Sequence, residues 1–155
     1  IEAVAIAATM TDDQEILAAA ALHDVIEDTD TTMEELEKEF GTRVARIVGE
    51  ESQLPIQGLS QVESWKFRRQ QAIEHLKEAN KEAKIVAMAD KLSNMRAIFR
   101  DYRALGNGLW DRFNVKDARL HKWYYESLLH SLSELDETES YQEYKFLVKS
   151  VFENI

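Results

Sequence analysis

The stretch from about residue 81 to 104 constrains the fold more than any other part of the chain, because its apolar residues recur at intervals of three and four. That spacing places them on one side of an α-helix and predicts a long helix buried along one face. The apolar set is Ile85, Val86, Met88, Ala89, Leu92, Met95, Ile98 and Phe99. A helix of this kind needs other helices to cover it.

Capping patterns predict where two further helices begin. Thr11 followed by Gln14 resembles a capping box, and it predicts a helix that opens there and runs through DDQEILAAAALHDVI. The same pattern at Thr31 or Thr32 opens a shorter helix, which Gly41 ends because glycine favours the C-terminal position.

The rest of the chain also reads as helices joined by short links. Further helices are expected from Thr42, which caps RVARIVGEE, and at about 63–79, 115–136 and 139–153. The best candidate for a loop is 52–62, which holds the single proline. With five glycines and no convincing strand, the sequence predicts an all-α fold, organised as one domain over 1–155.

Charge and composition exclude several classes of protein. Nineteen lysines and arginines against 29 aspartates and glutamates give a net charge of −10, which disfavours broad nucleic-acid binding. No apolar stretch approaches the roughly 20 residues that span a bilayer, and no signal-peptide pattern is visible, so we expect no membrane partner and a cytoplasmic location. Because the chain has no cysteine, any metal must be held by nitrogen and oxygen ligands.

Two polar groups stand out against this background. ALHDVIEDTD places His23 four residues before Glu27 and Asp24 four residues before Asp28, at a helix end where negative charge is disfavoured. In AMADKLSNMRAI, Asp90 interrupts an otherwise apolar helix, where a charge is costly unless it is paired or coordinated. Asn94 comes four positions after it.

One hypothesis joins the two groups. A divalent cation takes ligands from His23, Asp24 and Asp90, and Glu27 or Asp28 acts as general base on a water that the cation activates. Asn94 orients that water or a substrate oxygen, and manganese or iron suits the ligand set better than calcium. The alternative is a solvated acidic loop, with Asp90 paired to Lys91 or Arg96. Spacing alone does not separate these interpretations.

HDVIEDT and, later in the chain, MADKLSNMR resemble the two signatures of the HD-domain metal-dependent phosphohydrolases, and within them the alarmone hydrolase branch. The resemblance implies a helical bundle and a manganese site with His23, Asp24 and Asp90 as ligands. It also implies that Glu27 and Asp28 help to activate the attacking water and that Asn94 lies near metal and substrate. Members of this branch remove pyrophosphate from the 3′ position of guanosine tetra- or pentaphosphate.

One part of the family pattern is not present. The segment IEAVA at the start of the chain resembles the residues that come directly after the His-Pro of the family's first metal ligand. The resemblance therefore implies that this histidine precedes Ile1, so that 1–155 is a single HD hydrolase domain without its N-terminal ligand.

Candidate substrate contacts come from basic residues. Lys66 and Arg69 in WKFRRQ resemble a basic helix beside the family's pocket, and Arg119 in ARLHKWYYES resembles an arginine that lines it. Trp123 or Tyr124 could then stack on a base. The competing interpretation is a solvated helix face and aromatic residues in the core.

The leading prediction for function is hydrolysis of guanosine 3′,5′-bis(diphosphate), ppGpp, to GDP and pyrophosphate. An HD phosphohydrolase acting on another nucleotide, and a non-catalytic HD module that only binds a nucleotide, remain as alternatives. The sequence leaves the oligomeric state open.

Overall fold

The computed structural model describes residues 1–52 and 57–155, and within these residues it contains helices and no strands, which confirms the predicted all-α class. The α-helices are α1 (Glu2–Ala7), α2 (Gln14–Leu22), α3 (Val25–Asp28), α4 (Met33–Phe40), α5 (Thr42–Glu51), α6 (Gln61–Glu78), α7 (Lys81–Leu105), α8 (Ala118–Ser131) and α9 (Glu139–Phe152). Two 3-10 helices, η1 (Gly106–Arg112) and η2 (Ser133–Leu135), flank α8. Part of the expected loop at 52–62 lies outside the described residues.

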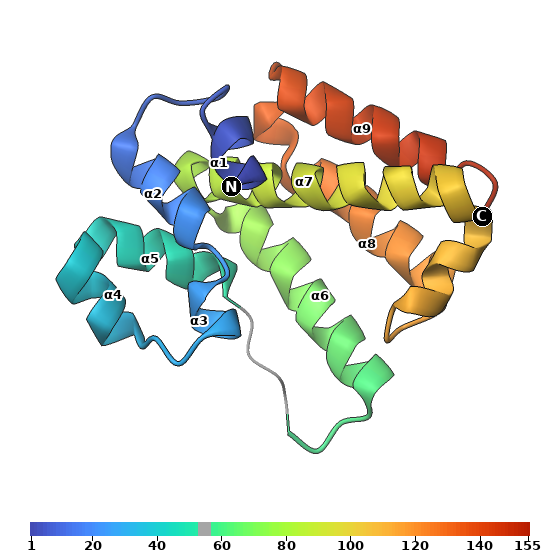
Figure 1. Ribbon diagram of the computed structural model, residues 1–155, viewed down its shortest axis with the longest axis horizontal. Coiled ribbons are helices and arrows are strands. Elements are labelled where there is room, and N and C mark those ends of the chain that lie inside the picture. Colours follow the sequence, from blue (N-terminus) through green and yellow to red (C-terminus); the bar gives the residue numbers. More distant parts are fainter. Residues whose placement is uncertain (53–56) are drawn as a thin grey trace.

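The long helix α7 is the centre of the arrangement (Figure 1). Helices α1 and α9 lie along it on one side, α6 and α8 diverge on the other, and α2 to α5 gather near its N-terminal half. The predicted apolar face of α7 is buried as expected, and burial extends all round the helix between Ala83 and Ala89. Covering helices are therefore needed on every side of this part of α7.

The helix starts agree only in part with the capping patterns. Asp13, not Thr11, caps α2, because its carboxylate accepts from the backbone N–H groups of Glu15 and Ile16. Thr11 instead accepts a hydrogen bond from the Asp13 backbone at 3.2 Å. An aspartate next to the first turn adds favourable charge at the helix N-terminus, which a threonine does not supply.

The short helix α4 begins with the capping box that Thr32 forms with Glu35, as one of the two predicted patterns requires. Gly41 ends it with φ at 90°, a backbone conformation that glycine adopts at little cost. Gly41 also occupies the N-cap position of α5, so Thr42 is the first helical residue rather than its cap. The Thr42 hydroxyl donates back to Glu37 at 2.7 Å.

The predicted single helix through DDQEILAAAALHDVI is wrong, because the chain turns at His23 and Asp24. Helix α2 ends at Leu22, and a second short helix, α3, begins at Val25. Glu27 and Asp28 therefore fall in the first turn of a new helix and not at the end of a long one. These two acids therefore do not extend the C-terminal end of α2, where the sequence pattern had placed them.

Arginines join the outer helices to the centre. Arg43 of α5 contacts Asp13 at 2.8 Å and Glu15 at 2.7 Å, and its guanidinium also pairs with Glu82 of α7. A guanidinium presents several donors in a fixed fork, so one side chain can hold three carboxylates together. This pairing orients α5 against α7.

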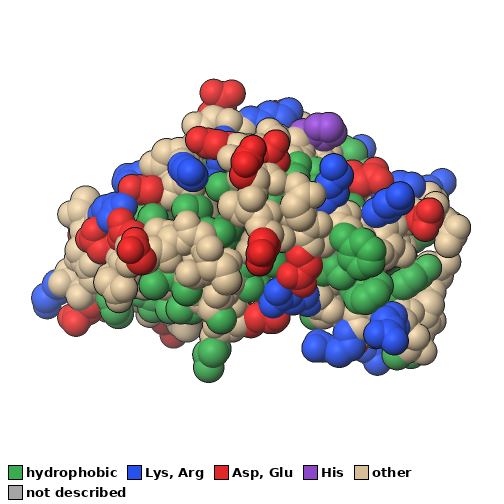
Figure 2. Space-filling model, turned by 90° about the horizontal axis from the view of Figure 1, so that it is seen from above, with side chains coloured by type: hydrophobic (Ala, Val, Ile, Leu, Met, Phe, Trp, Pro, Cys, Tyr) green, Lys and Arg blue, Asp and Glu red, His purple; other side chains and the backbone are tan. Residues whose placement is uncertain are grey.

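On the other side of α7, Arg96 makes two hydrogen bonds of 2.7 Å to Glu143 of α9 and one of 3.0 Å to Glu2 of α1. Figure 2 shows the molecule from this side, with acidic and basic side chains interspersed over the surface rather than gathered by sign. Among the helices of the described residues, none is long and apolar enough to cross a membrane.

A substitution at Leu92 tests whether α7 forms the centre of the core, because the Leu92 side chain is fully buried in the main hydrophobic cluster. Leu92→Ala is expected to lower the free energy of unfolding by about 2–5 kcal/mol, since the cavity left behind adds to the lost burial. Urea unfolding followed by circular dichroism measures this change. Leu105→Ala on the same helix is the control, and its 44% exposed side chain should cost less than about 1 kcal/mol. Equal losses in the two variants would contradict the assignment of α7 as the core.

Candidate active site

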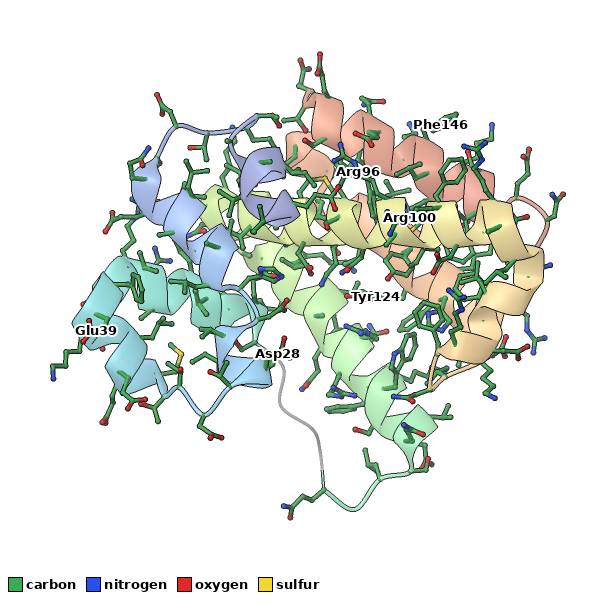
Figure 3. All side chains as sticks on the ribbon, in the orientation of Figure 1. Asp28, Glu39, Arg96, Arg100, Tyr124 and Phe146 are labelled. Atoms are coloured by element: carbon green, nitrogen blue, oxygen red, sulfur yellow. The ribbon has the colours of Figure 1, made fainter. Side chains whose placement is uncertain are left out.

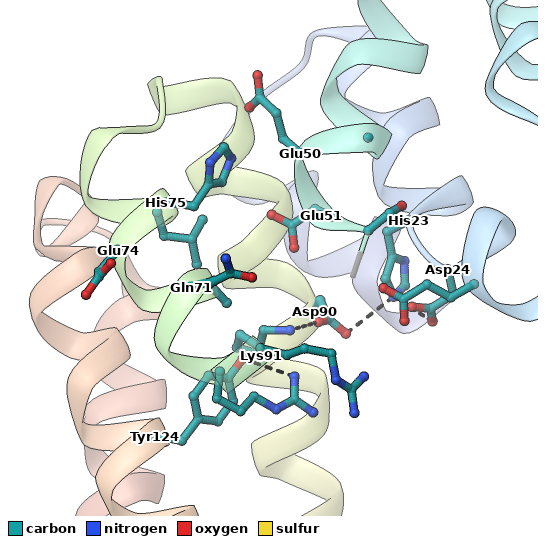
Figure 4. Close-up of a pocket in the computed structure, with 17 residues that line it drawn as sticks. His23, Asp24, Glu50, Glu51, Gln71, Glu74, His75, Asp90, Lys91 and Tyr124 are labelled. Carbon is teal, nitrogen blue, oxygen red and sulfur yellow. Dashed lines mark hydrogen bonds and ion pairs between the residues drawn. The ribbon is translucent and has the colours of Figure 1, made fainter. Parts of the chain in front are cut away.

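A pocket of about 570 Å³ is lined by residues of α5, α6 and α7, of the α2–α3 junction and of α8. The junction of α2 and α3 and the end of α5 form one side, and α6 with Tyr124 of α8 forms the other (Figure 4). The ionisable residues that line it are His23, Asp24, Glu27, Glu50, Glu51, Arg68, Arg69, Glu74, His75, Asp90 and Lys91.

His23 stands at the turn between α2 and α3 and joins two carboxylates. Its Nε2 lies 2.9 Å from Oδ2 of Asp24 and 3.3 Å from Oδ1 of Asp90, which comes from α7. On its other side Nδ1 donates to the Ala20 carbonyl at 2.8 Å, which orients the ring. The hydrogen bonds that His23 donates to Asp24 and Asp90 raise its pKa to about 10 against the opposing effect of burial.

Asp90 has three partners around one largely buried carboxylate. Besides His23, Lys91 pairs with Oδ2 and the Asn94 amide donates to Oδ1 at 3.1 Å. Burial by itself raises the pKa of Asp90, but the charge of Lys91 and the hydrogen bond from His23 outweigh it and hold this pKa well below its usual range. Burial would lower the pKa of Lys91, yet the charge of Asp90 raises it well above the ordinary value.

The contacts of Asp90 agree in part with each of the two interpretations drawn from the sequence, the structural pairing and the metal site. Asp90 pairs with Lys91, as the structural alternative expects, and it also contacts His23 from a distant part of the chain, whose Nε2 is shared with Asp24. Arg96 takes no part, because it pairs with acids on the opposite side of α7.

His23, Asp24 and Asp90 carry the nitrogen and oxygen atoms that bind divalent metals, although in this structure these side chains bind one another. Within residues 1–52 and 57–155, no group of three or more His, Cys, Asp or Glu side chains is arranged to hold a metal ion. The ring of His23 nevertheless has the orientation common among metal-bound histidines, because Nδ1 donates to a backbone carbonyl and Nε2 faces two carboxylates. Nε2 of His23 thus lies within 2.9 Å of one oxygen of Asp24 and 3.3 Å of one oxygen of Asp90.

The remaining residues predicted to take part in chemistry lie at different distances from this centre. Glu27 lines the pocket, and Asn94 is held through its hydrogen bond to Asp90. Asp28 is the exposed last residue of α3 (Figure 3) and is not among the residues that line the pocket. Glu27 thus lines the pocket together with His23, Asp24 and Asp90, whereas Asp28 lies outside its lining.

Of the basic residues predicted to contact substrate, one lines the pocket and two do not. Arg69 lines the pocket, and so does its neighbour Arg68, which the sequence did not single out. Lys66 is exposed and Arg119 pairs with Asp117 at 3.0 Å on the surface, and neither lines the pocket.

Glu50, Glu51 and His75 also line the pocket, although no sequence pattern pointed to them. Glu51 stands in the last turn of α5, and its carboxylate points into the space between Gln71 and Asp90 in Figure 4. Burial raises the pKa of Glu51 from 4.5 to about 7, against the lowering effect of Lys91. Only the packing of α5 against α7 brings this residue to the pocket, so no local signal could have revealed it.

A family model described as "HD domain" matches residues 1–107, which include every residue of the centre around His23 and Asp90. The chain belongs to the HD-domain family. The matched residues include the histidine-aspartate pair His23 and Asp24 and the later Asp90.

Curated relatives of this HD-domain chain include guanosine-3′,5′-bis(diphosphate) 3′-pyrophosphohydrolases. The zebrafish (Danio rerio) MESH1 is 46% identical over 90 residues, which is 57% of this chain and 46% of the relative. The human MESH1 is 40% identical over 85 residues, or 55% of this chain and 44% of the relative. The Aquifex aeolicus enzyme is 33% identical over 92 residues, or 56% of this chain and 12% of the relative. The chain thus spans less than half the length of the curated relatives it matches.

Solved structures show the same fold over nearly the whole chain. The crystal structure of lmo0812 from Listeria monocytogenes superposes with a TM-score of 0.83 at 27% identity, covering 99% of this chain and 92% of that one. A second structure, described as a metazoan ortholog of SpoT that hydrolyzes ppGpp, superposes with a TM-score of 0.68 at 25% identity and covers 99% and 77%. These likenesses support the helical arrangement around α7.

Glu51 provides a test of the pocket that needs no substrate. Because its pKa is raised from 4.5 to about 7 in the folded chain, the folded state keeps a proton that the unfolded state has released between these pH values. The folded state therefore loses stability as the pH rises through this window. In chelator-treated protein, Glu51→Gln should be more stable than the unchanged chain at pH 8, by on the order of 2 kcal/mol, and similar to it at pH 4.5.

Urea unfolding at both pH values measures this difference. Glu39→Gln, the same change on the exposed helix α4 (Figure 3), is the control and should leave stability nearly unchanged at both. A pH-independent effect of Glu51→Gln would show that the Glu51 carboxyl is not titrating in a buried setting.

Proposed function

We propose that this chain is a metal-dependent HD phosphohydrolase that removes pyrophosphate from the 3′ position of ppGpp. The observation that carries the proposal is the meeting of His23 and Asp24 with Asp90 of α7 on the wall of a pocket that also holds two arginines. The named activity of the relatives with 40% and 46% identity supports the choice of ppGpp over other nucleotides.

His23, Asp24 and Asp90 are the residues that would hold the proposed metal. When bound, a divalent cation supplies Lewis acidity that lowers the pKa of a water and polarises a phosphoryl oxygen. Imidazole and carboxylate without sulfur suit manganese, which we propose as the metal. The proton that Nε2 now shares with two carboxylates must leave before His23 can act as a ligand, so metal binding should release protons.

The residues around this centre then have separate tasks. Glu27, on the pocket wall, accepts the proton of the attacking water, and Asp28 beside it adds negative charge that favours this transfer. The Asn94 amide, oriented by its hydrogen bond to Asp90, positions a substrate oxygen with its remaining N–H. The water oxygen bonds to phosphorus, the 3′ oxygen leaves and takes a proton, and GDP and pyrophosphate are formed.

Two other functions remain as alternatives. An HD phosphohydrolase for a different nucleotide would use the same centre, so only the groups that contact the rest of the substrate distinguish it. A module that binds a nucleotide without hydrolysis would not need Glu27 at the pocket wall. Lys66 and Arg119, predicted as substrate contacts, stay predictions that the pocket lining does not support.

Full-length protein incubated with manganese and ppGpp should release pyrophosphate, measured by a coupled assay with chromatographic detection of GDP. Glu27→Gln should lower kcat by about 10²–10⁴-fold while bound manganese is retained, because only proton transfer is lost. Asp24→Asn should lose the metal itself. Asp30→Asn, on the exposed turn after α3, is the control for removing one acid nearby and should keep full activity. Release of orthophosphate, or no product at all, would contradict the proposed reaction.

A further inference from the structure

Glu51 is an acid on the pocket wall that the proposed reaction does not use. Its carboxylate points into the space between Gln71 and Asp90 in Figure 4. The carboxyl makes no hydrogen bond or ion pair with another residue in the described ranges 1–52 and 57–155. Burial raises the pKa of Glu51, so this carboxyl is less well hydrated than one on the open surface. Polar groups that lose water on folding usually gain a partner, and here a ligand in the pocket can supply it.

Two other acids that line the pocket differ from Glu51, because each accepts a hydrogen bond from a neighbouring side chain. Glu50 accepts from Arg46 at 3.3 Å, one turn back on α5. Glu74 of α6 accepts from the Gln70 amide at 2.6 Å. The oxygens of Glu51, by contrast, remain available to a group that enters the pocket.

The packing of α5 fixes the backbone that carries Glu51. Val48, three residues earlier, is fully buried, and the Ser52 hydroxyl donates to the Val48 carbonyl at 3.0 Å where the helix ends. Arg46 pairs with Glu82 of α7 at 2.9 Å. These contacts hold the last turn of α5 against α7, so the place of Glu51 in the pocket wall is set before a ligand arrives.

Glu51 also lies close to the centre around Asp90. The charges of Lys91, Asp90 and His23 all act on its carboxyl. In the proposed reaction, the 3′-phosphate group of the nucleotide occupies that centre. A side chain beside the centre therefore meets the part of the ribose that is next to the 3′ oxygen.

The chemistry of ppGpp restricts what Glu51 can bind. A carboxylate accepts hydrogen bonds and repels ionised phosphate groups, which have negative charge and no proton to donate. The hydrogen-bond donors of ppGpp are the ribose 2′-hydroxyl and the N–H groups of guanine. The 2′-hydroxyl is on the carbon next to the one that bears the reacting phosphate, whereas the N–H groups of guanine lie at the far edge of the base. Carboxylates also bind ribose hydroxyls in dinucleotide-binding proteins.

We infer that Glu51 accepts a hydrogen bond from the ribose 2′-hydroxyl of the substrate and so makes the pocket select ribonucleotides over 2′-deoxyribonucleotides. The inference rests on the proposed hydrolysis at the 3′ position and adds a specificity-determining residue to it. A 2′-deoxyribonucleotide leaves the carboxyl without a partner in the occupied pocket, and this penalty produces the selection. The 2′-hydroxyl takes part in no bond that forms or breaks, so Glu51 acts in substrate selection and not in the chemical step.

Kinetics on two substrates test this contact. In the manganese-loaded full-length protein, kcat/KM for ppGpp should exceed that for 2′-deoxyguanosine 3′,5′-bis(diphosphate) by roughly tenfold or more. Glu51→Leu should reduce this ratio to about one, whereas Glu51→Gln keeps an acceptor oxygen and should retain part of it. Glu39→Leu, the same change on the exposed helix α4, is the matched control and should leave the ratio as it is.

An unchanged protein that does not distinguish the two substrates would overturn the inference. So would a Glu51→Leu variant that loses activity equally on both, because Glu51 would then act on the reacting phosphate or on the metal centre. Thermal unfolding checks that Glu51→Leu is folded. If it is not, Glu51→Ala takes its place, since alanine removes the same oxygens without adding bulk.

A binding measurement separates this inference from the proposed reaction. Calorimetry on manganese-loaded Glu27→Gln, in which turnover should be slow, compares ppGpp with its 2′-deoxy counterpart in the presence and absence of Glu51→Leu. If ppGpp is not hydrolysed by the unchanged protein but its tighter binding depends on Glu51, the proposed reaction fails and the contact stands. If ppGpp is hydrolysed and the preference in binding does not depend on Glu51, the contact is wrong and the reaction stands. If ppGpp is not bound at all, both are wrong.

Discussion

The carboxylate of Asp90 is the group on which the arrangement of this molecule depends. It stands on the central helix α7, directly after a turn that is buried on all sides, where an unpaired charge would be costly. His23, Lys91 and Asn94 meet that need from three directions. One consequence is that the α2–α3 junction must lie against α7, because His23 comes from there. The pocket is the space that remains beside this junction once α5 and α6 are in place.

Acidic and basic side chains both line the pocket, although the net charge of the chain is −10. Glu27 of α3, Glu51 of α5 and Asp90 of α7 line the pocket, and α6 brings both Arg68 and Arg69 and the acid Glu74 to it. Elsewhere, as around Arg43 and Arg96, basic and acidic groups neutralise one another.

The fold class and most helices could be predicted from the sequence because they depend on local periodicity and turn residues. The apolar spacing over α7 led to a correct prediction of a long buried helix, and the capping box at Thr32 was correct. The break after Leu22 could not be predicted, since the alanine-rich run before it favours continuation of the helix. At this point His23 contacts both Asp24 and Asp90 of the distant helix α7, which no local pattern reveals.

By itself, the sequence determined the helical class, the HD-type pair of motifs and the identity of the groups at His23, Asp24 and Asp90, because periodicity and residue chemistry are local properties. Only the tertiary structure decided which charged residues share one space. It brought Glu51 and Arg68 to the pocket and left Lys66 and Arg119 outside the lining. The direction of a side chain on a helix depends on how that helix is rotated against its neighbours, and packing across the whole core sets that rotation. A face of the Tyr124 ring is covered for the same reason, since Arg69 reaches it from another helix.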